Sequence, residues 1–262
     1  MRRLRLDAEL VRRQLARSRE HADELIEAGR VQVRGSAATK PATGVEHDTP
    51  IRVLTDTEDP GYASRGGHKL AGALAEFLTL RVQGRRCLDA GASTGGFTDV
   101  LLRRGAREVA AVDVGYGQLV WALQSDPRVV VHDRTNVRTL TPDQIGGAAE
   151  LTVADLSFIS LGLVLPALTA CTVTDLVPMV KPQFEVGRQR LGRGGVVREP
   201  ELRAESVLAV ARTAQQLGWG TAGVARSPLP GPSGNVEFFL WLRQDAGPPD
   251  RAAIQAIVEE SA

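Results

Sequence analysis

The sequence predicts an α/β fold in which a mixed seven-stranded sheet, with helices on both faces, follows a small α/β module. Two observations support this prediction. From Arg86 onward, short runs rich in Val, Ala and Leu alternate with helical segments, which is the pattern of a parallel sheet covered on both faces. Two last apolar runs, 221–225 and 236–242, flank a loop rich in Pro and Gly, and we expect them to complete the sheet as a final pair of strands.

The composition narrows the class of protein. The 262 residues are 43% hydrophobic, enough for one large domain and a small module, and a net charge of +1 gives no global attraction to nucleic acid. Cys87 and Cys171 lack the spacing of a disulfide framework or a metal site, which indicates a reduced, cytoplasmic protein without a metal ion. With neither a bilayer-length apolar run nor a signal peptide, no membrane association is expected.

Changes in composition predict four parts of the chain. They are an N-terminal module, an acidic linker with a Pro-Gly turn, a large domain and a polar tail or fraying helix, at residues 1–58, 59–64, 65–245 and 246–262. Ser64 is the expected N-cap of a helix with an apolar face. Lys69 lies in the first turn of that helix, off the apolar face, where the helix dipole disfavours a cation. This placement weakly favours a functional role for Lys69.

Hydrophobic periodicity predicts the individual elements. In the module we expect helices over 6–15 and 18–28, the second capped by Ser18 and ended by Gly29, and a strand at 31–33. In the large domain the expected strands are 87–90, 109–113, 129–132, 151–155, 176–180, 221–225 and 236–242. The expected helices there are 64–78, 96–104, 118–124, 143–146, 160–169 and 201–217.

Residues 86–98, RCLDAGASTGGFT, have the form of a strand, a glycine loop and the start of a helix. Glycine lets the backbone approach a ligand closely, and the N–H groups of a helix N-terminus have no partners within the helix. A dinucleotide-binding loop would read G-x-G-x-x-G, but Ser93 replaces the middle glycine and Asp89 would repel a pyrophosphate. Asp113 ends the next strand, where a carboxylate can accept both ribose hydroxyls. Because S-adenosylmethionine carries an ammonium and a sulfonium but no phosphate, the two acids favour it over NAD.

Lysine is rare in this chain, since only Lys40, Lys69 and Lys181 among 32 Lys and Arg residues are lysine. Retained lysine indicates a need for a compact ammonium whose pKa can shift, although codon bias with chance survivors explains it equally well. Lys181 and Asp155 follow two predicted strands at the sheet edge where such folds bind ligands, and Glu237 begins the last strand there. Two lysines and two carboxylates suit activation of a poorly acidic hydroxyl, whereas each residue alone is more often part of a salt bridge.

The module carries an excess of positive charge. Its first 40 residues hold ten basic and six acidic side chains. Two short helices with arginines on one side, followed by a hairpin, suit docking onto folded RNA through shape and phosphates, and a solvated charged face is the alternative. The candidate RNA contacts are Arg5, Arg12, Arg13, Arg17, Arg19 and Lys40, with Arg65 and His68 beyond the linker.

These motifs resemble known families. Residues 6–35 with TKP at 39–41 are similar to the S4 RNA-binding domain. The large domain resembles FtsJ-type 2′-O-ribose methyltransferases, which have a Rossmann-like fold and use S-adenosylmethionine. Their catalytic Lys-Asp-Lys-Glu set falls on Lys69, Asp155, Lys181 and Glu237. An S4 module followed by SRGGHKL at 64–70, LDAGASTGGFT at 88–98, DLSFIS at 155–160, KPQFE at 181–185 and GNVE at 234–237 is similar to the TlyA family.

Membership of that family implies 2′-O-methylation of cytidine in ribosomal RNA, 23S and also 16S, with the S4 domain docking on a ribosomal subunit. It implies no obligate protein partner. The implied cofactor contacts lie in the glycine loop and after the neighbouring strands, at Asp89, Gly91, Ala92, Ser93, Thr94, Gly95, Gly96, Phe97, Asp113, Val114, Asn136 and Asp155.

The expected mechanism has Lys181 take the ribose proton, or hold the hydroxyl ready to lose it, while Asp155 orients the ammonium. Lys69 and Glu237 would position the nucleotide. Three alternatives remain at this point. They are a membrane-active haemolysin, a label that the TlyA family also carries, a non-catalytic ribosome-assembly protein that binds RNA, and a dehydrogenase, which lacks its fingerprint here.

Overall fold

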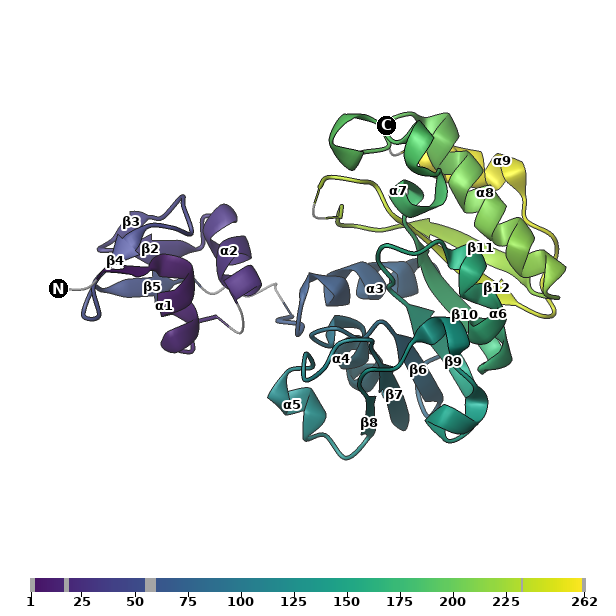
Figure 1. Ribbon diagram of the computed structural model, residues 1–262, viewed down its shortest axis with the longest axis horizontal. Coiled ribbons are helices and arrows are strands. Elements are labelled where there is room, and N and C mark those ends of the chain that lie inside the picture. Colours follow the sequence, from purple (N-terminus) through teal and green to yellow (C-terminus); the bar gives the residue numbers. More distant parts are fainter. Residues whose placement is uncertain (1–2, 17–18, 55–59, 232, 261–262) are drawn as a thin grey trace. The chain divides into compact units, whose positions relative to one another are not determined.

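The computed structural model describes residues 3–16, 19–54, 60–231 and 233–260, which form two compact units, Met1–Gly61 and Tyr62–Ala262 (Figure 1). Each unit has its own hydrophobic core. The predicted end of the module at residue 58, the candidate RNA contact Arg17 and the expected N-cap Ser18 lie outside the described residues.

In the N-terminal unit two helices pack on short antiparallel strands. Leu6, Leu10 and Ile26 of the helices are buried together with Val31 of the sheet, as the apolar stripes predict. One sheet has the strand order β3-β2-β5, and β1 pairs with β4. The elements are β1 Leu4–Arg5, α1 Leu6–Arg12, α2 Arg19–Glu27, β2 Val31–Val33, β3 Ser36–Ala37, β4 Gly44–Val45 and β5 Ile51–Val53.

The second unit contains the predicted mixed sheet of seven strands, in the order β11-β12-β10-β9-β6-β7-β8. The strands from β10 to β8 in this order are parallel, whereas β12 is antiparallel to both β10 and β11. The start of β12 therefore lies at the same edge as the ends of the parallel strands, here called the carboxyl edge. The strands are β6 Arg86–Ala90, β7 Glu108–Val112, β8 Val129–His132, β9 Ala149–Ala154, β10 Thr172–Val180, β11 Gly220–Arg226 and β12 Phe238–Arg243.

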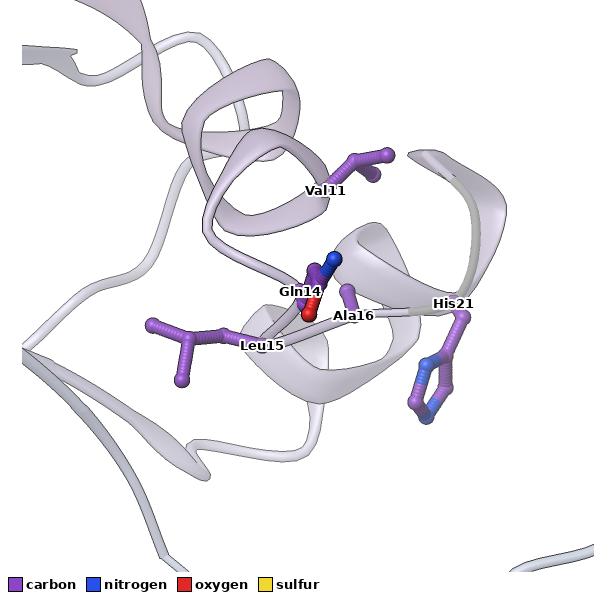
Figure 2. A pocket seen from close by; sticks show the side chains of 5 residues that line it. All are labelled: Val11, Gln14, Leu15, Ala16 and His21. Carbon is purple, nitrogen blue, oxygen red and sulfur yellow. The ribbon is translucent and has the colours of Figure 1, made fainter.

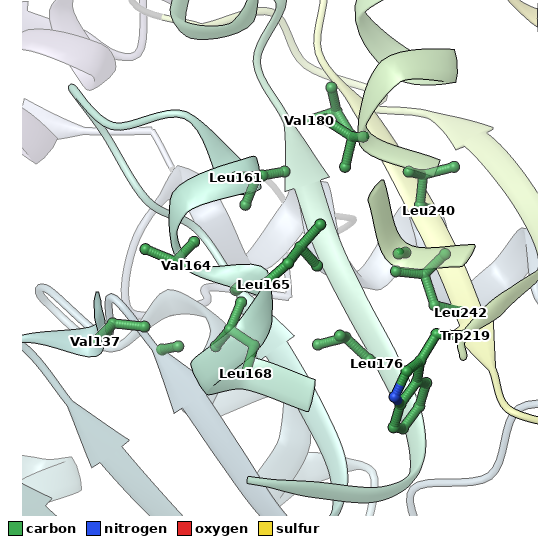
Figure 3. Packing of buried hydrophobic residues seen from close by; sticks show 14 of the residues in the cluster. Val137, Leu161, Val164, Leu165, Leu168, Leu176, Val180, Trp219, Leu240 and Leu242 are labelled. Carbon is green, nitrogen blue, oxygen red and sulfur yellow. The ribbon is translucent and has the colours of Figure 1, made fainter. Parts of the chain in front are cut away.

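Helices cover both faces of this sheet, and successive strand residues point into opposite cores. In β12, Phe238 and Leu240 belong to the core that α6 and α8 cover, whereas Phe239 and Trp241 belong to the core under α3 and α4. Figure 3 shows the first of these cores, where Leu165 and other residues of α6 lie against the sheet. The helices are α3 Arg65–Glu76, α4 Gly96–Arg103, α5 Trp121–Gln124, α6 Leu165–Ala170, α7 Pro182–Glu185, α8 Pro200–Gln216 and α9 Arg251–Glu259.

A short 3₁₀ helix replaces one predicted helix and the first turn of another. The first turn of the segment expected at 160–169 is the 3₁₀ helix Leu161–Leu163, and α6 begins only at Leu165, where Pro166 suits a new helix start. The segment expected at 143–146 is the 3₁₀ helix Pro142–Ile145, which begins with a capping box at Thr141. Three further 3₁₀ helices are Val137–Thr139, Arg188–Arg190 and Arg193–Gly195.

The C-terminal segment, expected as a polar tail or a fraying helix, contains α9 at residues 251–259 and is therefore helical for most of its length. Ile254 and Val258 lie four residues apart, so they share one face of the helix, and both are buried. They join the core that also contains residues of α8. Asp250 caps α9 through hydrogen bonds from the backbone N–H groups of Ala252 and Ala253. The sparse apolar residues of this segment therefore form a packed stripe.

Candidate active site

The glycine loop lies between β6 and α4, as its sequence predicts. Gly91 has a φ of +90°, and a Cβ there would lie 2.3 Å from the backbone oxygen of Asp155. Of the expected cofactor contacts, Ser93 is exposed and Thr94 half-buried, whereas the Phe97 side chain packs in the core against Phe239 with ring centroids 6.0 Å apart. Ala92, Gly95 and Gly96 are also buried. A ligand at this loop would meet mostly backbone.

Asp89 lies fully buried beneath the loop. Its Oδ2 accepts a hydrogen bond of 2.7 Å from the Thr98 hydroxyl, so it ties β6 to α4, and its Oδ1 has no partner among the described residues. Burial raises the pKa of Asp89 to about 7, although the Thr98 hydrogen bond opposes this shift. A cation beside the loop would favour the ionised form. The buried oxygen without a partner and the glycine cradle therefore fit the ammonium-bearing cofactor that the sequence favours.

Asp113 shapes the loop as well as facing the carboxyl edge. Its Oδ2 accepts a hydrogen bond of 2.9 Å from the backbone N–H of Ser93, and its Oδ1 accepts one of 2.7 Å from Gly115. Each carboxylate oxygen has a further lone pair, so hydroxyl groups can still donate to it. Val114 is 70% exposed, and the exposed Asn136 caps a 3₁₀ helix by accepting from the N–H of Arg138.

The four candidate catalytic residues form two ion pairs. Lys69 of α3 donates a 2.6 Å hydrogen bond to Glu237 Oε2, and both residues are buried, with 7% and 1% of their surfaces exposed. Lys181, directly after β10, lies 2.6 Å from Asp155 Oδ1, directly after β9. Because Glu237 precedes β12, the reversed strand direction brings it to the same edge.

The two pairs differ in their access to a substrate. The Lys69–Glu237 pair is enclosed, although Glu237 Oε1 has no partner among the described residues. A Cβ at Gly231 would lie 2.5 Å from that oxygen, so only glycine fits beside it. The side chains of Lys181 and Asp155 are 10% and 25% exposed. The Lys181–Asp155 pair is therefore the one that an incoming hydroxyl can reach.

Two features of the carboxyl edge escaped sequence reasoning. Lys181 donates a 3.0 Å hydrogen bond to the Ser157 hydroxyl, which holds the ammonium from a second side. Phe158 is 91% exposed in a left-handed conformation with φ of +63°, and its ring lies 5.3 Å from that of Phe184 in α7. An exposed aromatic ring held in a strained backbone is a signal of function that only the structure reveals.

Carboxylates hold most of the arginines expected to bind RNA. Asp7 accepts from Arg5 and Arg19 at 2.8 Å each, and the hydrogen bond from Arg5 is the main cause that holds the pKa of Asp7 well below its usual range. Glu9 accepts hydrogen bonds from Arg12 and Arg13. These bonds, chiefly the one from Arg12, lower the pKa of Glu9 to about 2. Both carboxylates are buried.

The four arginines therefore do not offer equal surface to a ligand. Arg13 is only 21% exposed, because it also donates to the backbone oxygens of Thr49 and His47. Arg5, Arg12 and Arg19 remain 52%, 45% and 60% exposed. Arg13 thus has mainly a structural role, whereas the other three can contact a phosphate while their carboxylates orient them.

The remaining candidates lie at the surface of their units. Lys40 is exposed. In the second unit, Arg65 donates a 3.3 Å hydrogen bond to the Pro230 oxygen, and the His68 ring meets the Tyr62 ring edge-on at 5.1 Å. Ser64 holds the N-cap position of α3 but makes no side-chain capping bond. An open pocket between α1 and α2 is lined by Val11, Gln14, Leu15, Ala16 and His21 (Figure 2), none of which is a predicted contact.

Neither a metal-binding cluster nor a membrane-spanning helix is present among the described residues. In the part of the chain that the structure describes, no group of three or more His, Cys, Asp or Glu residues could hold a metal ion. Within those same ranges, no helix is both long and apolar enough to cross a membrane.

The fold and the glycine loop define a methyltransferase. Residues 62–244 match the family model of the FtsJ-like methyltransferases, and residues 4–51 match that of the S4 domain. The chain belongs to the FtsJ-like methyltransferases and carries an S4 domain, as its motifs predicted.

Relatives place it in the TlyA family. It is 65% identical over 244 residues, 92% of this chain and 90% of the relative, to the 16S/23S rRNA (cytidine-2′-O)-methyltransferase TlyA of Mycobacterium tuberculosis. It is 42% identical to the putative rRNA methyltransferase YqxC of Bacillus subtilis, over 98% and 93% of the two chains. The solved structure of a putative hemolysin from Streptococcus thermophilus is 38% identical, with a TM-score of 0.79 over 100% of this chain and 96% of that one.

Proposed function

We propose that this protein transfers a methyl group from S-adenosylmethionine to the 2′-hydroxyl of cytidine in ribosomal RNA, in the 23S and also the 16S molecule. The observation that carries this proposal is the partly exposed Lys181–Asp155 pair at the carboxyl edge, directly beside the glycine loop. The activity for which the 65% identical relative from Mycobacterium tuberculosis is named supports the choice of cytidine and of both RNAs. The S4 domain supports docking on RNA.

The cofactor would be held by the glycine loop, with Asp89 beneath it and Asp113 and Val114 beside it. The buried Asp89 Oδ1 would balance the charge of the amino group, and the free lone pairs of Asp113 would accept from ribose hydroxyls. When bound, S-adenosylmethionine supplies a methyl group on a sulfonium, which an oxygen nucleophile can attack. The loop backbone orients this group and the buried core behind it excludes water.

Lys181 is the proposed base for the ribose hydroxyl. Asp155 and Ser157 hold its ammonium group from two sides, so one direction remains for a hydroxyl at the exposed face. As the neutral amine, Lys181 would take the hydroxyl proton and become the ammonium that Asp155 and Ser157 hold; alternatively, the ammonium would donate a hydrogen bond to the hydroxyl oxygen while the proton passes to water. In either case the oxygen attacks the methyl group. The enclosed Lys69–Glu237 pair would position the nucleotide, because Glu237 Oε1 is left to accept a hydrogen bond.

The exposed ring of Phe158 supports a nucleic-acid substrate. It lies one residue beyond Ser157, so a base that stacks on it would bring its ribose near Lys181. Arg5, Arg12 and Arg19 of the S4 domain would add contacts to phosphates, which position the RNA without reading its sequence.

A methyl-transfer assay tests this proposal. Purified protein is incubated with ribosomal subunits and methyl-tritiated S-adenosylmethionine, and the modified nucleotides are mapped by primer extension. We expect 2′-O-methylated cytidine in both RNAs, and none with Lys181→Ala. RNA binding without methyl transfer would instead show a non-catalytic assembly protein. Leakage of liposomes at the same protein concentration would support a haemolysin.

A further inference from the structure

Arg203 is a buried cation without a carboxylate partner. It lies in the first turn of α8 with 8% of its surface exposed, and its Nε donates a 2.9 Å hydrogen bond to the backbone oxygen of Val197. Among the residues that the structure describes, Arg203 forms no ion pair and its Nη groups donate no hydrogen bond, and these Nη groups border solvent rather than being fully enclosed. Arginine is almost never buried in this way unless it is paired.

The surroundings of Arg203 make the lack of a partner more costly. The positive end of the α8 dipole points toward the first turn, where a cation is disfavoured. Burial, followed by the positive charge of Arg226, lowers the pKa of Arg203, and the opposing effect of Glu199 is smaller. Three features therefore disfavour a cation at this place, and a bound anion would offset all of them.

Both arginines are tied to the segment that carries Glu237. The N–H of Val197, whose oxygen holds Arg203, donates a 2.9 Å hydrogen bond to the buried Asn235 side chain, two residues before Glu237. Arg226 ends β11 opposite Phe238 of β12. The N–H of the next residue, Ser227, donates a hydrogen bond to the backbone oxygen of Glu237. Arg203 and Arg226 thus belong to the carboxyl edge, on the side of Glu237 away from the glycine loop.

We propose that Arg203 and Arg226 bind a backbone phosphate of the RNA substrate next to the methylated nucleotide. This inference rests on the proposed function, because it places the target ribose beside Lys181 and Glu237. A guanidinium binds a phosphate with two parallel hydrogen bonds, and a contact of this kind fixes the position of the RNA. Arg203 is held in place by Val197 at the start of α8, and the exposed Arg226 at the end of β11 would complete the contact.

Binding of an rRNA fragment at increasing salt tests this proposal. Loss of one phosphate contact should lower the slope of log K against log salt by about 0.7–0.9. We expect Arg203→Gln and Arg226→Gln each to show this change and to bind the fragment about tenfold more weakly. Arg226→Lys should restore most of the slope. Arg212→Gln is the matched control, because Arg212 is an exposed arginine further along α8, and it should behave as wild type.

A second measurement separates RNA from a free anion and a binding role from a structural one. The thermal midpoint is followed in phosphate and in chloride at equal ionic strength. If Arg203→Gln loses stabilisation by inorganic phosphate but keeps the wild-type salt slope for RNA, the site takes a free anion and our proposal is wrong. A lower thermal midpoint in both salts with unchanged RNA binding would show a purely structural arginine and would also overturn it.

The failures of the two proposals are distinguishable. Wild-type methylation combined with unchanged salt slopes in both arginine variants overturns the phosphate site and leaves the proposed function intact. A lowered slope in the variants of a protein that methylates no rRNA overturns the proposed function and the placement beside a methylated nucleotide, but it supports an RNA phosphate contact at Arg203 and Arg226.

Discussion

The two units of this protein use the same kind of ion pair in different ways. In the S4 domain the carboxylates of Asp7 and Glu9 are buried, and the arginines that reach them extend across the surface. At the carboxyl edge of the methyltransferase domain, Lys69 and Glu237 are both buried, and each cation has its own carboxylate. The first arrangement orients side chains for a ligand at the surface. The second keeps charges in a site from which most water is excluded, where they act more strongly.

The largest effect is expected from the partly exposed Lys181–Asp155 pair, which holds the proposed base. Lys181→Ala should reduce single-turnover methyl transfer about 10²- to 10⁴-fold, because it removes the proposed base. Lys181→Arg sharpens the result, since arginine keeps the charge but cannot lose a proton. If Lys181→Arg is as inactive as Lys181→Ala, Lys181 takes the proton. A folded Lys181→Ala protein with a near-normal rate would contradict the assignment.

The enclosed pair should affect stability more than any exposed one. Lys69→Met or Glu237→Gln leaves a buried charge without its partner and should reduce the free energy of unfolding by about 3–5 kcal/mol. The double variant should recover part of this loss. Tryptophan fluorescence in urea measures the free energy of unfolding of the second unit alone, because Trp121, Trp219 and Trp241 all lie there. Losses below about 1 kcal/mol in both single variants would show that water reaches the pair.

The pairs of the S4 domain should give an intermediate, pH-dependent effect. Because its folded pKa of about 2 lies below the ordinary 4.5, Glu9 stabilises the fold fully above pH 4.5 and progressively less as the pH falls toward 2. Glu9→Gln should cost about 1–3 kcal/mol at pH 7 and flatten this dependence. Amide hydrogen exchange in α1 and α2 measures it. A variant with the same acid dependence as wild type would show that Glu9 is not its source.

The smallest effect is expected from a pair exposed on both sides. Arg190 and Glu205 form such a pair, with side chains 51% and 54% exposed. Glu205→Gln should change the free energy of unfolding by less than about 1 kcal/mol, and salt should reduce even that. Urea unfolding at low and high salt provides the measurement. A larger loss in the free energy of unfolding would show that the contribution of an ion pair does not follow its exposure. That result would contradict the comparison between the two units.

Periodicity and motif spacing predicted much of the fold and of the candidate site. The alternation of apolar runs predicted the seven strands, and the glycine loop with Asp89 and Asp113 lies between β6 and α4 as its sequence predicted, while cofactor binding there stays a prediction. The structure also brings Lys69, Asp155, Lys181 and Glu237 to one edge of the sheet. These features were predictable because strand direction and connection order fix which strand ends meet. Their catalytic roles stay predictions.

Side-chain partners were not predictable in the same way. Sequence reasoning treated the arginines of the S4 domain as one basic face, and the tertiary fold divides them between buried carboxylates and backbone oxygens. It also missed the hydrogen bond from Lys181 to Ser157, the packing of α9 and the solitary Arg203. Each of these features depends on which segments far apart in the sequence come into contact. A local sequence pattern contains no information on such contacts.

The sequence by itself determined the class of fold, the glycine loop with its two acids and the four charged residues, because each is marked by a short local motif. Only the tertiary structure decided how these charges pair, which of them a substrate can reach, and which cation is left without a partner. The physical reason is burial. It is set by the packing of whole elements on the sheet, and it decides whether the same two charges form a surface contact or a reactive site.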